Sequence, residues 1–188
     1  MKNSLPVFFA ASLCALLLTL SACRSKNEYL IKSPNYFEYQ ANKECAGFSA
    51  AYVLRSLGIE AKGMDIYNQI EIKNPDGTVN PTEIYKIFES RNIDGDSKYN
   101  LGLDELKKDL KKGTPVIVLV KLNPTSKYYH YLTLVGYSED ELYFAESVRA
   151  EVNVKNKKHY NRKVSNEDFI KMWEIDSTYK NIYFVIKK

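Results

Sequence analysis

The sequence predicts a protein of the α+β class, in which N-terminal helices pack on an antiparallel sheet. Apolar and small residues recur every three or four positions in the first part of the chain, which is typical of helices that bury one face. The second part contains β-branched and aromatic runs separated by short polar turns, which is typical of neighbouring antiparallel strands. The 188 residues suffice for one domain with its own core.

The first residues predict export. Residues 1–22 hold one basic residue, an uncharged run rich in Leu, Ala and Phe, and small residues at the end, which is the pattern of a signal peptide. The letters LSAC at 20–23 resemble a bacterial lipobox, whose cysteine is lipidated and becomes the first mature residue. The alternatives are an ordinary signal peptide and an uncleaved anchor, but the run is shorter than the roughly 20 apolar residues that span a bilayer comfortably.

These features divide the chain into a lipoprotein signal peptide, a lipidated tether and one globular domain, at residues 1–22, 23–35 and 36–188. We expect a bacterial envelope protein that faces outside the cytoplasm and is attached to the membrane through lipidated Cys23. Without its first 22 residues the chain has 26 basic and 23 acidic side chains, a net charge of +3. Because this charge is small, we expect no nucleic-acid partner. We also expect a monomer.

The helices are predicted from periodicity and from their ends. One begins at or near Cys45 and stops at Gly58, and a second is suggested at residues 63–74. Residues 36–39, just before the first helix, suggest a short strand. Pro81 favours the start of a third helix, because proline suits the first helical position.

The caps add detail to the later helices. Asn80 is the expected cap of the third helix, and Glu83 stands where a capping box needs an acid. Residues 103–112 predict a short amphipathic helix closed by Gly113. Ser165 is the expected cap of a last helix that runs through Trp173.

The strands follow from β-branched and aromatic runs. Residues 114–122 are almost entirely apolar, which predicts a buried central strand. Residues 138–141 predict the turn of a hairpin. The basic stretch 151–163 predicts a further hairpin or a solvated loop. The remaining strands are expected at 129–137, 142–147 and 181–187.

One cysteine remains unpaired in the predicted mature protein. Cys14 leaves with the signal peptide and Cys23 carries lipid, so Cys45 has no partner for an intramolecular disulfide. An unpaired thiol in an exported protein is either buried and inert or reactive. A thiol of ordinary pKa is only about 3% ionised at pH 7. Both the first turn of a helix and a neighbouring histidine raise the fraction of nucleophilic thiolate.

The chain has two histidines that could assist Cys45. His130 stands near the start of a predicted strand, where a helix N-terminus packed on the sheet could reach it. His159 lies within a basic run that should be solvated, where no neighbouring group would orient its ring. We therefore favour His130 as the base.

A third group is needed to orient the histidine. Glu146 ends the return strand of the hairpin and is the preferred candidate. If Tyr137 pairs with Leu142, however, His130 shares a sheet face with Ser147 unless a bulge or a different loop length shifts the register. Ser147 is therefore the alternative. An amide donor for an oxyanion could come from Gln40, beside the backbone N–H of Cys45 at the helix start.

Together, Gln40, Cys45 at a helix start, the strand with His130 and the hairpin that ends in an acid resemble papain-like peptidases related to those that process bacteriocin leaders after a double glycine. The resemblance extends from about Tyr36 to about Ile186. It implies a papain-like fold and a peptide substrate. In the implied roles Cys45 attacks the peptide carbonyl, His130 relays the proton, Glu146 orients His130 and Gln40 stabilises the oxyanion.

The sequence departs from that family at two places, and other readings of the residues stay open. Ala46 replaces the usual glycine after the cysteine, and Glu146-Ser147 replaces an aspartate followed by proline. The segment ECAGFSAAYV also resembles NlpC-type cell-wall endopeptidases. A catalytically weak or inactive lipoprotein that binds a peptide is the non-enzymatic alternative. No cofactor is predicted, and no metal site, because Cys and His residues lie far apart without a close ligand pair.

Overall fold

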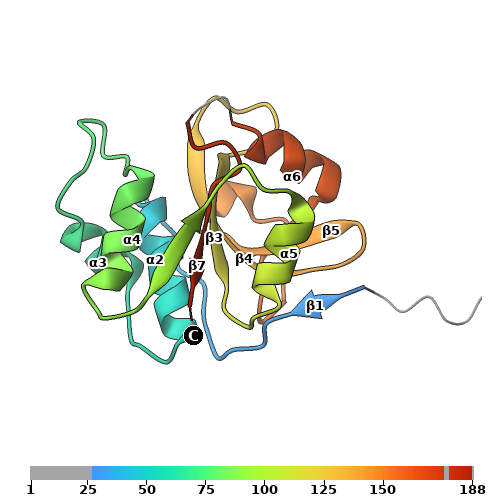
Figure 1. Cartoon of the computed structure of the whole chain (residues 1–188), viewed down its shortest axis with the longest axis horizontal. Helices are drawn as coiled ribbons and strands as arrows, with labels where there is room; N and C mark the ends of the chain where they lie inside the picture. The colour runs from blue at the N-terminus through green and yellow to red at the C-terminus, as the bar shows by residue number, and fades with distance from the viewer. Residues whose placement is uncertain (1–26, 176–177, 188) are drawn as a thin grey trace, which may run out of the picture.

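The structure, a computed structural model, describes residues 27–175 and 178–187. The predicted signal peptide and the lipobox with Cys23 lie outside these residues. Helices flank a seven-stranded sheet in which every pairing is antiparallel, and the strand order is β2-β7-β3-β4-β5-β6, with β1 attached to β4. Figure 1 shows α2, α3 and α4 on one side of this sheet and α5 and α6 on the other. The α+β prediction is confirmed.

The elements have the following bounds. The helices are α2 (Cys45–Ser56), α3 (Gly63–Gln69), α4 (Pro81–Glu89), α5 (Leu103–Leu110) and α6 (Asn166–Trp173), with a 3₁₀ turn, η2, at Arg149–Glu151. The strands are β1 (Tyr29–Leu30), β2 (Gly95–Lys98), β3 (Val116–Lys121), β4 (Tyr129–Tyr137), β5 (Glu141–Ala145), β6 (Arg162–Ser165) and β7 (Tyr183–Ile186).

Two apolar clusters cover the opposite faces of the sheet. Along β3, Ile117 and Leu119 belong to the cluster with α2 and α4, whereas Val116, Val118 and Val120 belong to the cluster with α5 and α6. This alternation follows from the two-residue period of a strand. Because β3 is covered on both faces, it is the buried central strand that its apolar sequence predicts.

Helix α2 ends where the sequence predicts it to end. Gly58 has a φ of +82°, its N–H donates to the Arg55 carbonyl, and the N–H of Ile59 donates to the Leu54 carbonyl, which is the pattern of a Schellman cap. At the other end, a Cβ on Gly47 would come within 2.5 Å of the Gly63 carbonyl oxygen. The absence of a side chain at Gly47 therefore lets α2 and α3 approach each other closely.

The structure corrects one helix cap and confirms another. Helix α4 begins at Pro81 as predicted, but the Asn80 side chain makes no capping hydrogen bond, and Glu83 pairs with Lys86 instead of closing a capping box. In α6 the Ser165 hydroxyl accepts a hydrogen bond of 3.0 Å from the N–H of Asp168. The predicted serine cap is thus correct.

The sheet also differs from the prediction at its margins. Residues 36–39 form no strand. Instead, β1 lies within the segment predicted as a tether, where Tyr29 pairs with Tyr137 and Leu30 with Gly136. The edge strand β2 has the sequence GDSK, which lacks any apolar alternation, so its pairing with β7 depends on the tertiary fold.

Candidate active site

Cys45 is the first residue of α2, and its side chain is half-buried. An α-helix leaves its first N–H groups without intrahelical partners, and these groups form the positive end of the helix dipole. Small residues follow the cysteine, and Ala46, Ala50 and Ala51 are fully buried against the sheet. This packing carries the start of the helix to the sheet strand that holds His130.

His130 is the second residue of β4 and pairs with Val120 of the central strand. Its side chain is 3% exposed. The ring nitrogen Nε2 lies 2.9 Å from Oε1 of Glu146, and the thiol of Cys45 is close enough to the ring to raise its pKa. Since Nε2 is engaged by the carboxylate, Nδ1 is the nitrogen left for the thiol. His130 thus bonds Glu146 and lies close to the thiol of Cys45.

A β-bulge aligns Glu146 with His130. Tyr137 does pair with Leu142, the register that by itself would place Ser147 on the face of His130. The pairing then moves from Gly136–Tyr143 to Leu134–Phe144, so β4 carries one extra residue, Val135. This extra residue shifts every later pair by one position. Glu146 therefore takes the face on which His130 stands.

Burial and charge act in opposite directions on the His130 ring. Burial lowers its pKa, but the charge of Glu146 and hydrogen bonds to Cys45 and Glu146 outweigh burial and raise the pKa to about 10. In Glu146, burial raises the pKa, and the charge and hydrogen bond of His130 together with Arg162 lower it below its usual value. The arrangement favours an imidazolium beside a carboxylate.

Other groups besides His130 hold Glu146 in place. Oε2 accepts a hydrogen bond of 2.8 Å from Arg162, and the N–H of Val148 donates to Oε1. The Asn161 amide bonds both the N–H and the carbonyl of Glu146, at 2.7 and 2.9 Å. Both carboxylate oxygens are satisfied, as a buried charge requires. These contacts fix the longer side chain of a glutamate in one position.

Sequence reasoning missed Arg162 and Asn161. It assigned both to a basic stretch predicted as a hairpin or solvated loop, yet they are 4% and 3% exposed. Arg162 begins β6, pairs with Phe144 of β5 and also reaches the Leu122 carbonyl at 2.8 Å. Their place in the sequence could have indicated this role, because a strand that follows the hairpin lies beside the strand that leads to Glu146.

Gln40 lies on the other side of the same strand end. Its backbone N–H donates to the Ser147 carbonyl at 3.0 Å, and its Oε1 accepts a hydrogen bond of 2.6 Å from the Ser147 hydroxyl. Its Nε2 donates to the Asn42 carbonyl. Ser147 therefore contacts Gln40, and Glu146 is the residue that contacts His130.

The second histidine takes no part in this arrangement. His159 lies in the loop before β6, where its backbone carbonyl accepts a hydrogen bond of 3.2 Å from Tyr52.

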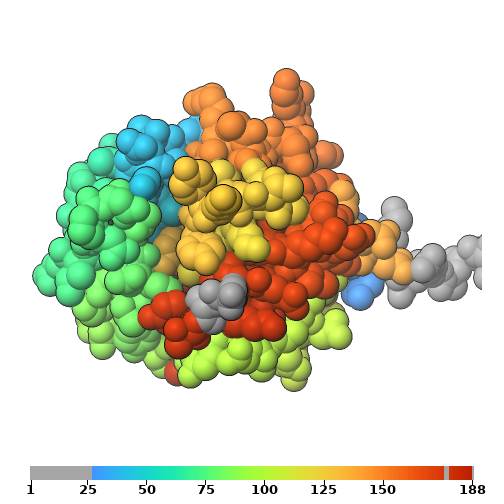
Figure 2. All heavy atoms as spheres, turned by 90° about the horizontal axis from the view of Figure 1, so that it is seen from above, coloured from blue at the N-terminus to red at the C-terminus, as the bar shows by residue number. Residues whose placement is uncertain are grey.

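Figure 2 shows the face of the molecule on which the blue segment leading into α2 lies beside the yellow segment between β3 and β4. The described residues contain no cluster of His, Cys, Asp or Glu that could hold a metal ion. Within the same residues, no helix has the length and apolar character to span a membrane.

The α+β fold, with a cysteine at a helix start near a histidine that bonds a carboxylate, has features of papain-like cysteine peptidases. Residues 31–181 match the model of the Peptidase_C39 like family, and the chain belongs to this family. A comparison with curated proteins finds no match.

Solved structures share the fold. A C39-like peptidase from Bacillus anthracis is 18% identical, with a TM-score of 0.64 over 87% of this chain and 98% of the other. A double glycine motif protease of an AMS/PCAT transporter, solved with a leader peptide, is 19% identical, with a TM-score of 0.59 over 84% and 93%. The peptidase domain of Streptococcus ComA is 14% identical, with a TM-score of 0.61 over 81% and 97%.

Proposed function

We propose that this protein is a cysteine peptidase that cleaves peptide bonds with Cys45 as nucleophile, His130 as acid and base, Glu146 as orienting group and Gln40 as oxyanion donor. One observation carries the proposal. The buried imidazole of His130 bonds the buried carboxylate of Glu146, and the thiol at the start of α2 is close enough to raise the pKa of the imidazole. The family match favours this reading over an NlpC-type endopeptidase.

In the first half of the reaction, the Cys45 proton passes to His130, which leaves a thiolate beside an imidazolium. The sulfur attacks the peptide carbonyl carbon, a C–S bond forms, and the carbonyl electron pair moves to oxygen. The oxygen anion is stabilised by Nε2 of Gln40 and the N–H of Cys45. His130 then gives its proton to the amide nitrogen, the C–N bond breaks, and the amine product leaves a thioester behind.

In the second half, water attacks the thioester carbon while His130 accepts a proton from it. The C–S bond breaks, the acid product departs, and Cys45 returns as thiolate with His130 protonated. Glu146 stays ionised throughout and stabilises the imidazolium. The raised pKa of His130 and the lowered pKa of Glu146 support these charge states at neutral pH.

The substrate that we propose is a peptide or an extended segment of a protein. One of the similar structures was solved with a leader peptide, and its name describes a protease for double glycine motifs. Peptides with a Gly-Gly pair are therefore the first candidates to test. We also propose that lipidated Cys23 holds the domain at the outer face of a bacterial membrane, in accordance with the LSAC motif.

The test of the peptidase is cleavage of a peptide library by residues 24–188, with Cys45→Ala as the matched control. We expect cleavage by the parent domain and none by the variant. Iodoacetamide should alkylate Cys45 well below pH 8 in the parent and much more slowly in His130→Asn, because the histidine takes the thiol proton. Slow alkylation of the parent without any cleavage would instead favour an inactive peptide-binding protein.

The anchor is tested separately, in bacteria that express the full chain. We expect the protein in the membrane fraction, with a mature N-terminus at Cys23 whose mass includes acyl chains. Cys23→Ser should leave the lipid off and retain the uncleaved signal peptide. A mature protein that begins elsewhere and carries no lipid would show that residues 1–22 are an ordinary signal peptide.

A further inference from the structure

We infer that Ser147 is a positioning residue that fixes the orientation of the Gln40 amide, so that its N–H end faces the oxyanion. The inference rests on the proposed peptidase function. Two contacts join the residues: the Gln40 N–H donates to the Ser147 carbonyl at 3.0 Å, and the Ser147 hydroxyl donates to Oε1 of Gln40 at 2.6 Å. Ser147 is 7% exposed, so water competes little for this hydroxyl.

Only the nitrogen end of a side-chain amide can donate a hydrogen bond to an oxyanion. Gln40 presents an acceptor oxygen at one end and a donor NH₂ group at the other, and rotation by half a turn about its last bond exchanges them. The carbonyl of Asn42 accepts a hydrogen bond but cannot donate one, so it must face Nε2. The oxygen end then faces the Ser147 hydroxyl, which acts as donor.

This arrangement leaves one hydrogen of Nε2 for the substrate. The first hydrogen bonds the Asn42 carbonyl, and the oxygen is occupied by Ser147. A flipped amide would put its oxygen against the Asn42 carbonyl oxygen. It would also present an acceptor, instead of a donor, to the negative charge that develops on the substrate oxygen. The serine contact thus holds the productive orientation before the substrate arrives, which is what electrostatic preorganisation requires.

The same strand end serves both halves of the site. Glu146 and Ser147 are consecutive, so their side chains leave the extended chain on opposite sides, one toward the His130 ring and the other toward Gln40. The register that the bulge imposes therefore sets the orientation of the histidine and that of the oxyanion donor together.

The experiment compares Ser147→Ala, Ser147→Thr, Gln40→Ala and the double variant Gln40→Ala/Ser147→Ala on a peptide that the parent cleaves. Ser147→Ala should lower kcat about 10-fold with little change in KM, less than the roughly 10²- to 10³-fold loss on removal of a whole oxyanion donor. Ser147→Thr keeps the hydroxyl and should restore most of kcat. In the double variant, loss of Ser147 should add nothing to loss of Gln40, because the residues act as one unit.

Two controls separate this role from general damage. Ser56→Ala removes a hydroxyl that bonds the Val53 carbonyl at 2.7 Å, near the far end of α2, and should leave kcat unchanged. Alkylation of Cys45 forms no oxyanion, so it should proceed equally fast in Ser147→Ala and in the parent. Slower alkylation in that variant would mean that the thiol site itself is disturbed, which would overturn the inference.

Failure of the inference and failure of the proposed function give different results. If the parent cleaves peptides but Ser147→Ala keeps its kcat, or if the two losses multiply in the double variant, the inference fails alone. If the parent cleaves nothing, NMR of the Gln40 side chain still decides whether Ser147 orients the amide. Its NH₂ hydrogens should exchange with solvent faster in Ser147→Ala than in the parent, and equal rates would overturn the inference.

Discussion

At the scale of single residues, the candidate site depends on how buried charges are compensated. Removing a carboxylate or an imidazole from water costs several kcal/mol unless its partners replace the lost hydration. Glu146 meets this requirement with His130 on one oxygen and Arg162 on the other. These two contacts hold the glutamate side chain in one position, although it is longer than the aspartate that is usual in the family named above.

Removal of the Glu146 charge should lower the pKa of His130. In Glu146→Gln, burial still lowers the pKa of His130, but the largest of the effects that raise it, the charge of Glu146, is absent. We expect that pKa to fall from about 10 toward or below its usual value of 6.5. NMR titration of the imidazole carbons measures it.

The titration has a simple assignment, because the chain has only two histidines. His159→Gln removes the second signal and should leave the His130 titration as it is in the parent. A histidine that titrates near the same pH in Glu146→Gln and in the parent would contradict the role assigned to the carboxylate.

At the scale of elements, β1 and the bulge in β4 depend on each other. The carbonyl of Val135, the extra residue of the bulge, accepts a hydrogen bond of 2.9 Å from the N–H of Ile31, just after β1. Gly136 lies directly opposite Leu30. A side chain at position 136 has no room, because a Cβ there would stand 2.6 Å from the Tyr29 carbonyl oxygen.

Gly136→Ala should therefore detach β1 from the sheet while the rest of the sheet stays folded. We expect a loss of about 1–3 kcal/mol of unfolding free energy, the usual cost of an overpacked site. Hydrogen exchange provides the measurement: the Ile31 amide should lose protection, whereas amides of the β3–β4 ladder serve as the internal control. Full protection of Ile31 in the variant would show that β1 tolerates the added methyl group.

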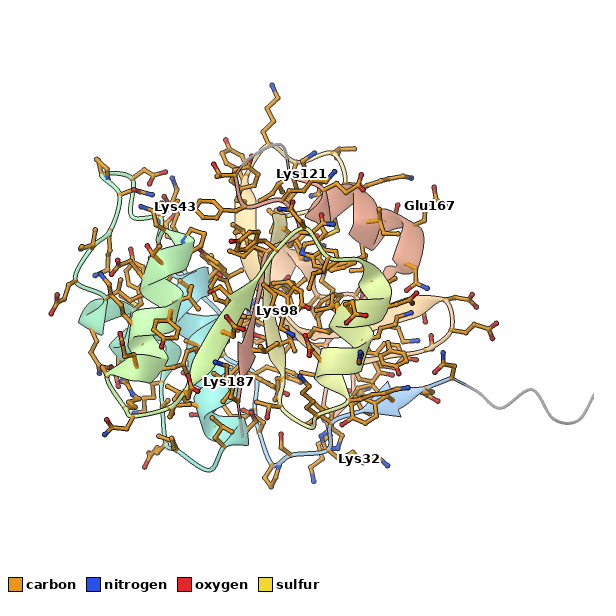
Figure 3. The ribbon with its side chains drawn as sticks, viewed as in Figure 1. Lys32, Lys43, Lys98, Lys121, Glu167 and Lys187 are labelled. Carbon is orange, nitrogen blue, oxygen red and sulfur yellow. The ribbon has the colours of Figure 1, made fainter. Side chains whose placement is uncertain are left out.

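At the scale of the whole molecule, residues close to the candidate site and the segment that follows β1 lie at opposite edges of the view in Figure 3. Figure 3 labels Lys43, two residues before Cys45, and Lys121, the β3 partner of Tyr129, in the upper half of the view. Lys32, which follows β1, lies at the lower edge.

The His130 charge should also appear in the stability of the whole domain. The folded ring has a pKa of about 10 and the unfolded ring about 6.5, so between these values the folded state holds a proton that the unfolded state releases. The stabilisation is complete below pH 6.5 and disappears as the pH rises through 10. Unfolding free energies from urea titrations at pH 6 to 10 measure this loss.

His130→Gln provides the comparison, since its other titrating groups remain. The unfolding free energy of the parent should fall more steeply between pH 7 and 10 than that of the variant. Parallel curves for the two proteins would mean that the folded histidine is not charged in this range.

The sequence alone determined the elements whose signals are local. The start of α2 at Cys45, its end at Gly58, the serine cap of α6 and the apolar strand β3 each follow from residues within a few positions of one another. The same is true of the strand that carries His130. These features depend on backbone conformation and on the burial of one face, which short patterns encode.

Only the tertiary structure decided which side chains meet. The bulge at Val135 depends on the packing of that residue with Tyr52 and Tyr143 and on the docking of β1, contacts between segments far apart in the chain. Arg162 is buried because β6 pairs with β5, although it stands in a basic stretch of the sequence. A shift of one residue in strand register exchanges the two faces, and no local pattern at Glu146 or Ser147 records that shift.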